Sequence, residues 1–228
     1  MKRFYSTIFF LCFINAAFTQ QLSQVTYTYA TSLAWFTVTT GQNVLIRISD
    51  DGKALEWGTE EQSLFSNNYY APKLLPYMGR VDYYGPEADS AYRGKVKNIG
   101  TTTITYYGSG EFAVKTGKIK TIGSLLFDYY THFDDKLLSG KIKNMGATAI
   151  GYYTSFDNES FKGKLKTVGN TAITYYSSFD DALIKGKIKS IGSFNYTWYT
   201  SHDPKGYGGG LKSGAMRQLV NTVTYILW

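Results

Sequence analysis

Lysine and tyrosine side chains recur at a fixed interval along the middle of this 228-residue chain, and they are the residues best suited to hold a ligand. Lysine ammonium groups attract acidic groups, and aromatic rings offer flat apolar faces. The pattern predicts a binding platform for an acidic glycan. The alternative is a solvated sheet face on which lysines discourage aggregation. The candidate ligand-binding residues are Lys118, Lys141, Lys164, Lys187, Tyr130, Tyr153 and Tyr176.

These residues belong to a stretch that repeats every 23 residues between Gly94 and Gly208. A period of this size is typical of stacked units that cannot bury a core alone. Each copy contains a run of the form GKIKxIG and a Tyr-rich run of the form ITYYxSF, separated by turn residues. Both runs suit β-strands, and short connections make antiparallel neighbours, so we expect one β-hairpin per copy.

Side chains alternate between the two faces of a strand, which predicts how each hairpin is divided. In the copy that begins at position 163, Leu165 and Thr167 share one face, and Val168 lies with the lysines on the other. In the second strand, Tyr175 and Phe179 share the apolar face. The candidate tyrosines are expected on the same face as the lysines.

The sequence therefore predicts an all-β fold, an antiparallel β-meander of 23-residue hairpin repeats that forms an elongated or curled sheet. A closed β-barrel is the alternative. Four segments are expected: a signal peptide (1–19), an N-terminal β-hairpin region (20–78), the repeat array (79–208) and a C-terminal capping repeat (209–228). The N-terminal hairpins are expected to begin or cover the same sheet.

The first residues have the pattern of a secretory signal, with Lys2 and Arg3 followed by an uncharged apolar stretch from Tyr5 to Phe18. Cleavage after Ala17 or Thr19 is expected, which predicts a secreted, periplasmic or outer-surface protein. The mature chain would have no cysteine and 22 basic against 17 acidic residues, a net charge of +5. That mild excess does not indicate a nucleic-acid binder.

The opening of each copy, Tyr92-x-Gly94 or Phe161-x-Gly163, together with the 23-residue length, resembles MORN-type repeats. The resemblance implies an elongated, twisted β-meander that acts as a scaffold and in some members contacts membranes or partner proteins. The copies depart from that family at its tryptophan position, where Val96 stands here. The Y-Y-x-x-F-D signature is also similar to uncharacterised secreted bacterial β-hairpin repeat proteins.

Catalytic and metal-binding motifs are not found in the sequence. The histidines are His132 and His202, and no nucleophile elbow, zinc-protease motif or phosphate-binding glycine loop occurs. Acidic pairs such as Asp134-Asp135 could offer oxygen ligands to Ca²⁺, but turn residues are the favoured interpretation. We therefore expect no enzyme activity, no metal and no cofactor.

The functional prediction is a secreted, non-catalytic repeat protein that binds or scaffolds at the cell envelope. The expected partner is an acidic glycan or an envelope protein. The alternatives are an outer-membrane β-barrel protein and, less favoured, a carbohydrate-active enzyme.

Overall fold

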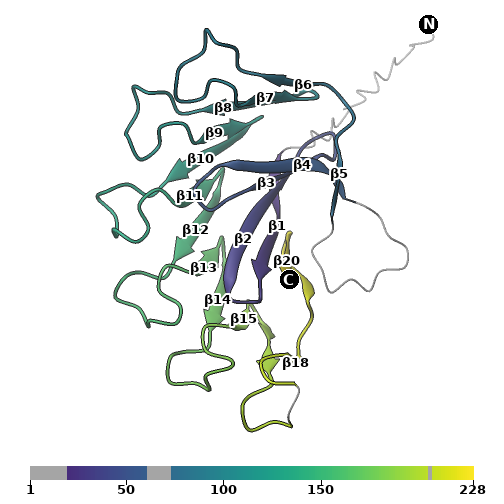
Figure 1. Cartoon of the computed structure of the whole chain (residues 1–228), viewed down its shortest axis with the longest axis vertical. Helices are drawn as coiled ribbons and strands as arrows, with labels where there is room; N and C mark the ends of the chain where they lie inside the picture. The colour runs from purple at the N-terminus through teal and green to yellow at the C-terminus, as the bar shows by residue number, and fades with distance from the viewer. Residues whose placement is uncertain (1–19, 61–72, 205–206) are drawn as a thin grey trace, which may run out of the picture.

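The computed structural model describes residues 20–60, 73–204 and 207–228. In this part of the chain every regular element is a β-strand, and the strands form two large sheets and one two-stranded ribbon (Figure 1). The expected signal peptide, residues 1–19, lies outside the described residues. The predicted all-β, meander-like fold is confirmed.

The repeats form an eleven-stranded antiparallel sheet in which every strand pairs with its neighbours in sequence. Its strands are β6 (Val81–Tyr83), β7 (Val96–Ile99), β8 (Thr102–Tyr106), β9 (Ile119–Ile122), β10 (Leu125–Tyr129), β11 (Ile142–Met145), β12 (Thr148–Tyr152), β13 (Leu165–Val168), β14 (Thr171–Tyr175), β15 (Ile188–Ile191) and β16 (Phe194–Asn195). Strands β6 and β16 are the two edges, so this sheet is open rather than closed on itself.

Two kinds of connection alternate along this sheet. A two-residue turn joins β13 to β14, and its first residue, Gly169, has φ +54°, which suits the first position of a tight hairpin turn. A longer turn joins β14 to β15, and it ends at Gly186, which has φ +74°. Glycines occupy both positions in each copy because other residues are strained in this backbone region.

The expected division of faces is wrong in two respects, and the first arises because the pairing register shifts by one residue within each pair of strands that a long connection joins. Between β12 and β13 the partner of Gly151 is Thr167, but the partner of Tyr152 is Leu165. The extra residue changes the phase of the alternation. Leu165 and Val168 are therefore both buried, although strict alternation places Val168 with the lysines.

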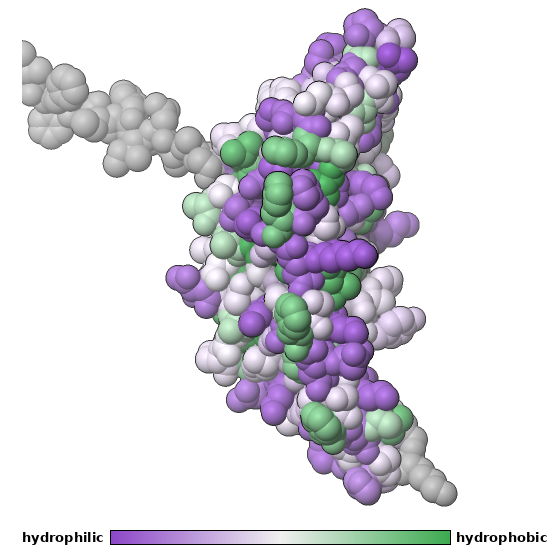
Figure 2. All heavy atoms as spheres, turned by 90° about the vertical axis from the view of Figure 1, so that its left-hand side faces the viewer, coloured by the Kyte–Doolittle hydropathy of each residue, from purple (hydrophilic) through white to green (hydrophobic). Residues whose placement is uncertain are grey.

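Phe179 also departs from the expected apolar face, because it lies in the long turn after β14 and is exposed. The long turns form one side of the molecule (Figure 1), and on that side hydrophobic groups recur among hydrophilic ones (Figure 2).

A seven-stranded sheet packs against the repeat sheet, in the order β19-β20-β1-β2-β3-β4-β5. Its strands are β1 (Gln21–Thr28), β2 (Ser32–Thr39), β3 (Leu45–Ile48), β4 (Ala54–Glu60), β5 (Leu74–Pro76), β19 (Arg217–Val220) and β20 (Val223–Leu227). One hydrophobic core contains side chains of both sheets, including Phe36 and Ile46 from this sheet and Phe127 and Ile173 from the repeats. The seven-stranded sheet therefore covers the apolar face that the repeats cannot bury alone.

Turns of the N-terminal sheet also hydrogen-bond the beginnings of the repeat strands. The amide of Ile119 donates to the carbonyl of Gly52 at 3.1 Å, and the amide of Ile142 donates to the carbonyl of Asp50 at 2.7 Å. These bonds hold the β3–β4 turn across the repeat sheet.

The last twenty residues are divided between the two parts of the fold. Strand β18 (Leu211–Ser213) pairs with β17 (Thr197–Trp198) and continues the repeat pattern. Strands β19 and β20 then form a hairpin, and β20 runs parallel to β1 in the N-terminal sheet. Within the described ranges, no helix has the length and hydropathy needed to cross a membrane.

Candidate binding site

The four candidate lysines each follow a glycine of positive φ and stand just before the first strand of a repeat. Lys164 Nζ donates to the carbonyl of Gly186, one repeat further on, at 2.7 Å. Lys118 and Lys187 donate to the corresponding glycine carbonyl of the repeat that follows them. These lysines therefore join neighbouring repeats.

Lys141 has a different partner. Its ammonium group lies 2.6 Å from Oδ2 of Asp50, which belongs to the β3–β4 turn. This ion pair connects the repeat sheet to the N-terminal sheet.

An aromatic ring lies under each candidate lysine, 4.7–5.2 Å from the ammonium nitrogen to the ring centroid. Such contacts stabilise a cation that has lost part of its hydration. Burial lowers the pKa of Lys118 and Lys187, and it lowers the pKa of Lys164 to about 8. In order along the chain, the rings are those of Tyr129, Tyr152, Tyr175 and Trp198.

The candidate tyrosines Tyr130, Tyr153 and Tyr176 are half-buried, and their hydroxyl groups point to the next repeat. Each hydroxyl donates to a backbone carbonyl twenty residues later, at 2.9–3.0 Å. The lysines Lys143, Lys166 and Lys189 lie over their rings at 5.0–5.5 Å. Contacts within the protein therefore occupy both the hydroxyl group and one ring face of these tyrosines.

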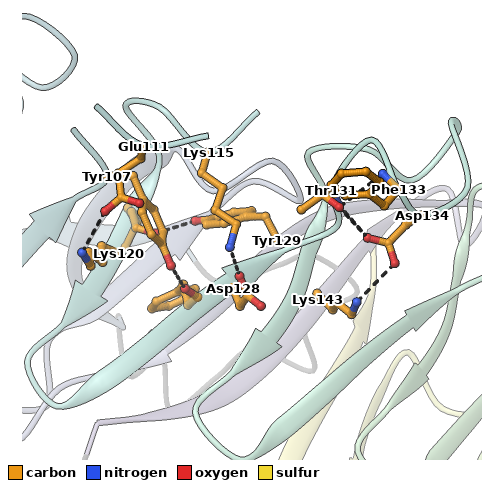
Figure 3. Close-up of polar contacts among 12 residues, drawn as sticks. Tyr107, Glu111, Lys115, Lys120, Asp128, Tyr129, Thr131, Phe133, Asp134 and Lys143 are labelled. Atoms are coloured by element: carbon orange, nitrogen blue, oxygen red, sulfur yellow. Dashed lines mark hydrogen bonds and ion pairs between the residues drawn. The ribbon is translucent and has the colours of Figure 1, made fainter. Parts of the chain in front are cut away.

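Acidic residues in the long turns are also bound within the protein. Asp134 Oδ2 accepts a hydrogen bond from the backbone N–H of Thr131 at 2.8 Å, and Oδ1 accepts one from Lys143 at 3.2 Å (Figure 3). The hydrogen bond from Thr131 lowers the pKa of Asp134, with a smaller contribution from Lys143. One repeat earlier, Glu111 and Lys120 form the ion pair that corresponds to that of Asp134 and Lys143. In the described ranges, no group of three or more His, Cys, Asp or Glu side chains is arranged to hold a metal ion.

The described residues form clefts along the junction of the two sheets, and each candidate lysine lines one of three such clefts. The smallest, about 240 Å³, contains Lys187, and the next, about 340 Å³, contains Lys141 and Lys164. The candidate tyrosines are not among the residues that line these clefts. The structure therefore places the two groups of candidate residues in different surroundings, because the candidate lysines stand at the junction of the sheets and the candidate tyrosines stand at the long turns.

The largest of these three clefts, about 670 Å³, lies between the β3–β4 hairpin and the first repeats. It contains three lysines and three aromatic side chains, contributed by both walls. Its charged and aromatic lining residues are Asp51, Lys53, Trp57, Tyr83, Lys95, Tyr106 and Lys118.

The electrostatics of this cleft are dominated by its lysines. Burial lowers the pKa of Lys95, and the charge of Lys53 lowers it further. Burial would raise the pKa of Asp51, but hydrogen bonds from Lys53 and Ser49 lower it, so this carboxylate stays ionised. Lys53 Nζ lies 2.7 Å from Asp51 Oδ2. Three cations and one carboxylate therefore face a partly apolar space, which favours an anionic ligand with a flat apolar part.

Sequence reasoning missed the half of this cleft that comes from the N-terminal sheet, namely Lys53 and Trp57. The Asp-Asp-Gly sequence at 50–52 does predict the turn that carries them. No local signal says that this turn lies across the repeat sheet.

Comparisons with protein-family models, curated proteins and solved structures find no match to the chain. The resemblance to MORN-type repeats therefore stays a prediction.

Proposed function

We propose that the protein is a secreted, non-catalytic binding protein of the cell envelope, and that the 670 Å³ cleft takes an acidic sugar unit of a glycan. The observation that carries this proposal is the convergence of Lys53, Lys95 and Lys118 with Trp57 and Tyr106 at one cleft. The aromatic side chains offer apolar faces to a sugar ring, and the ammonium groups offer donors to its carboxylate or sulfate.

The lysines keep donors for a ligand even though all three are bonded within the protein. An ammonium group has three N–H donors. Lys95 and Lys118 each give one to a glycine carbonyl, and Lys53, which is exposed, gives one to Asp51. An anion in the cleft would stabilise the protonated lysines, so we expect binding to weaken as the pH becomes alkaline.

The non-catalytic part of the proposal is supported by the composition of the cleft. Among the described residues that line it, Asp51 is the one carboxylate, and it is paired with Lys53. A pair of carboxylates across the cleft, as most glycoside hydrolases need, is not present there.

The test is calorimetric titration with an acidic and a neutral oligosaccharide over a series of salt concentrations. We expect selective binding of the acidic ligand, weakened by salt because exposed charges are screened. Lys53→Gln should weaken binding about tenfold, as expected for the loss of one charge-assisted contact. Lys136→Gln is the matched control, because Lys136 is exposed in a long turn and its loss changes the net charge equally. Equal effects of the two variants, or no acidic preference, would overturn the proposal.

Secretion is proposed from the sequence of residues 1–19. The first described residue, Gln20, accepts hydrogen bonds from Ser124 through its side-chain oxygen, at 3.1 Å from N and 2.9 Å from Oγ. A folded chain that begins near Gln20 is compatible with this contact. Mass spectrometry of the exported protein should find the mature N-terminus after Ala17 or Thr19, and an intact N-terminus would contradict the proposal.

A further inference from the structure

A row of phenylalanines stands exposed in the long turns, one in each of three successive repeats. Phe133, Phe156 and Phe179 occupy the same repeat position and are 82%, 95% and 93% exposed. The position continues as His202 in the next copy. The side of the molecule that carries the long turns shows hydrophobic groups one above another, separated by hydrophilic ones (Figure 2).

The recurrence of these rings has no explanation in packing. The other recurrent positions of the repeat have structural partners: glycines adopt positive φ, and lysines and tyrosines bind carbonyls of the next repeat. The exposed phenylalanines bury little surface, yet the same residue type returns three times. A single exposed apolar residue is ordinary, but a regular series of them indicates an interaction surface.

The turns that carry the rings are held rigidly. Asp157 Oδ2 accepts a hydrogen bond from the backbone N–H of Thr154 at 2.6 Å, which closes the turn around Phe156. Asp135 Oδ2 accepts bonds from N and Oγ of Ser155 in the following turn, at 2.9 and 2.7 Å. Neighbouring turns are therefore hydrogen-bonded to each other, so the rings are presented in a fixed order before any ligand arrives.

The same link joins the next pair of turns. The backbone N–H of Ser178 donates to Asn158 Oδ1 at 3.0 Å, and Asn158 Nδ2 donates to Ser178 Oγ at 2.8 Å. Because each repeat contributes two strands spaced about 4.8 Å apart, the rows advance by about 10 Å per repeat at the sheet. The result is a linear series of single aromatic rings.

We propose that this row, Phe133, Phe156 and Phe179, is a second binding site, and that its ligand is an uncharged linear glycan whose sugar rings stack on the phenylalanines. A chain of flat sugar units repeats along a line, as the rings do. None of the three phenylalanines is among the residues that line the 670 Å³ cleft, so this site is separate from the one proposed for an acidic ligand.

The charge of the turns favours a neutral ligand. Residues 131–140, 154–163 and 177–186 each contain two acidic residues and one lysine, so each turn carries a net charge of −1. An Asp follows each phenylalanine directly in the sequence. Because Lys143, just outside the first of these turns, pairs with Asp134, the turns offer no excess of positive charge to an acidic glycan or an anionic lipid surface, while their carboxylates can accept hydrogen bonds from sugar hydroxyls.

The spacing of the rings also favours a glycan over a folded protein partner. A stable protein interface buries about 800 Å² on each side around a continuous apolar centre. Here charged and hydroxyl side chains, such as Asp134 and Ser155, separate one ring from the next. Isolated rings of this kind suit a chain that contacts the protein at intervals.

The test compares the protein, without residues 1–19, with a variant carrying Phe133→Ala, Phe156→Ala and Phe179→Ala. Affinity electrophoresis in gels containing hydroxyethyl cellulose, galactomannan or polygalacturonate measures binding. We expect retardation by at least one neutral polysaccharide, a loss of about fivefold in affinity for each ring removed, and a loss of about 100-fold in the triple variant. Met78→Ala is the control, because Met78 is also exposed but lies outside the turns.

Folding does not confuse this test, because the three side chains are exposed. Surface substitutions of this kind change the free energy of unfolding by about 0.5 kcal/mol or less. Lys53→Gln should leave neutral-glycan binding unchanged, which separates this site from the cleft. Equal retardation of the native and triple-variant proteins would overturn the proposal. The absence of any neutral-glycan binding would also overturn it. Sedimentation with phosphatidylcholine vesicles is measured in parallel, and a triple variant that loses vesicle binding but keeps its glycan binding would overturn the proposal as well.

Discussion

Replacing Tyr153 by Phe removes one hydroxyl group and leaves the ring contacts in place. The hydroxyl donates to the carbonyl of Ile173 at 3.0 Å, across neighbouring repeats. The ring packs against Phe161, with 4.6 Å between ring centroids, and against Tyr175, with 5.9 Å. Burial raises the pKa of Tyr153, as expected for a phenol withdrawn from water. The substitution therefore isolates the bond between repeats.

The expected loss follows from the geometry of that bond. A hydrogen bond contributes about 1 kcal/mol net, and a half-buried carbonyl left without its donor raises the cost to about 1–2 kcal/mol. For a chain of this size, about 1 kcal/mol lowers the melting temperature by about 2–4 °C. We expect Tyr153→Phe to lower it by about 2–8 °C. Tyr130→Phe and Tyr176→Phe should behave alike, and their effects should add because each acts at a separate site.

Thermal unfolding followed by circular dichroism measures the change in melting temperature, with Tyr29→Phe as the control. Tyr29 is largely exposed, so its hydroxyl should contribute little. If Tyr153→Phe is as stable as Tyr29→Phe, the hydroxyl row does not join the repeats. If Tyr153→Phe instead weakens glycan binding at unchanged stability, this tyrosine is a ligand residue, as the sequence pattern predicts.

Three further predictions concern the turns and the lysines. Gly94→Ala should lower the free energy of unfolding by about 1–2 kcal/mol because of its φ of +75° alone, since nothing lies within 4 Å of the added methyl group. Gly186→Ala should lower it more, because the methyl group would lie 2.8 Å from a backbone carbonyl oxygen. Denaturant titration of the two variants compares these losses. The pKa of Lys164, about 8 in the folded protein and near 10.5 when unfolded, means that the unfolded chain binds more protons between these values, so stability should rise with pH in that window. Unfolding at about pH 7 and about pH 9.5 should show this rise reduced in Lys164→Met, and an equal rise in both proteins would contradict it. Lys141→Met breaks the ion pair with Asp50 and should lower the free energy of unfolding by about 1 kcal/mol. Asp50→Asn should give a similar loss, and the double variant should lose little more than either single variant. Fully additive losses would show that the pair does not couple the sheets.

The repeat sheet could be predicted in some detail, because its information is local. Glycines at fixed positions, such as Gly169 and Gly186, mark turns that require positive φ, and β-branched and aromatic runs between them mark strands. The recurrence of these signals indicates stacked antiparallel hairpins whichever sheet covers them. The lysine and tyrosine rows could likewise be found from spacing alone.

The contacts of those rows could not be predicted in the same way. A shift of one residue, as between Gly151 and Tyr152, exchanges the two faces of a strand, and nothing in the alternation marks where it occurs. This shift buries Val168, and the turn after β14 leaves Phe179 in solvent. Whether a lysine binds a ligand or a carbonyl depends on such shifts.

By itself, the sequence determined the 23-residue period, the all-β class and the turn positions, because each depends on residues close together in the chain. Only the tertiary structure decided that β20 pairs with β1 and that the β3–β4 turn lies across the repeats. Those associations join residues far apart in the chain, and they depend on the burial of complementary apolar faces. Many different pairings of strands and sheets would satisfy the same local pattern of apolar residues, so the pattern does not select one of them. The cleft containing Lys53 and Lys118 exists because of that association, so no stretch of sequence contains it.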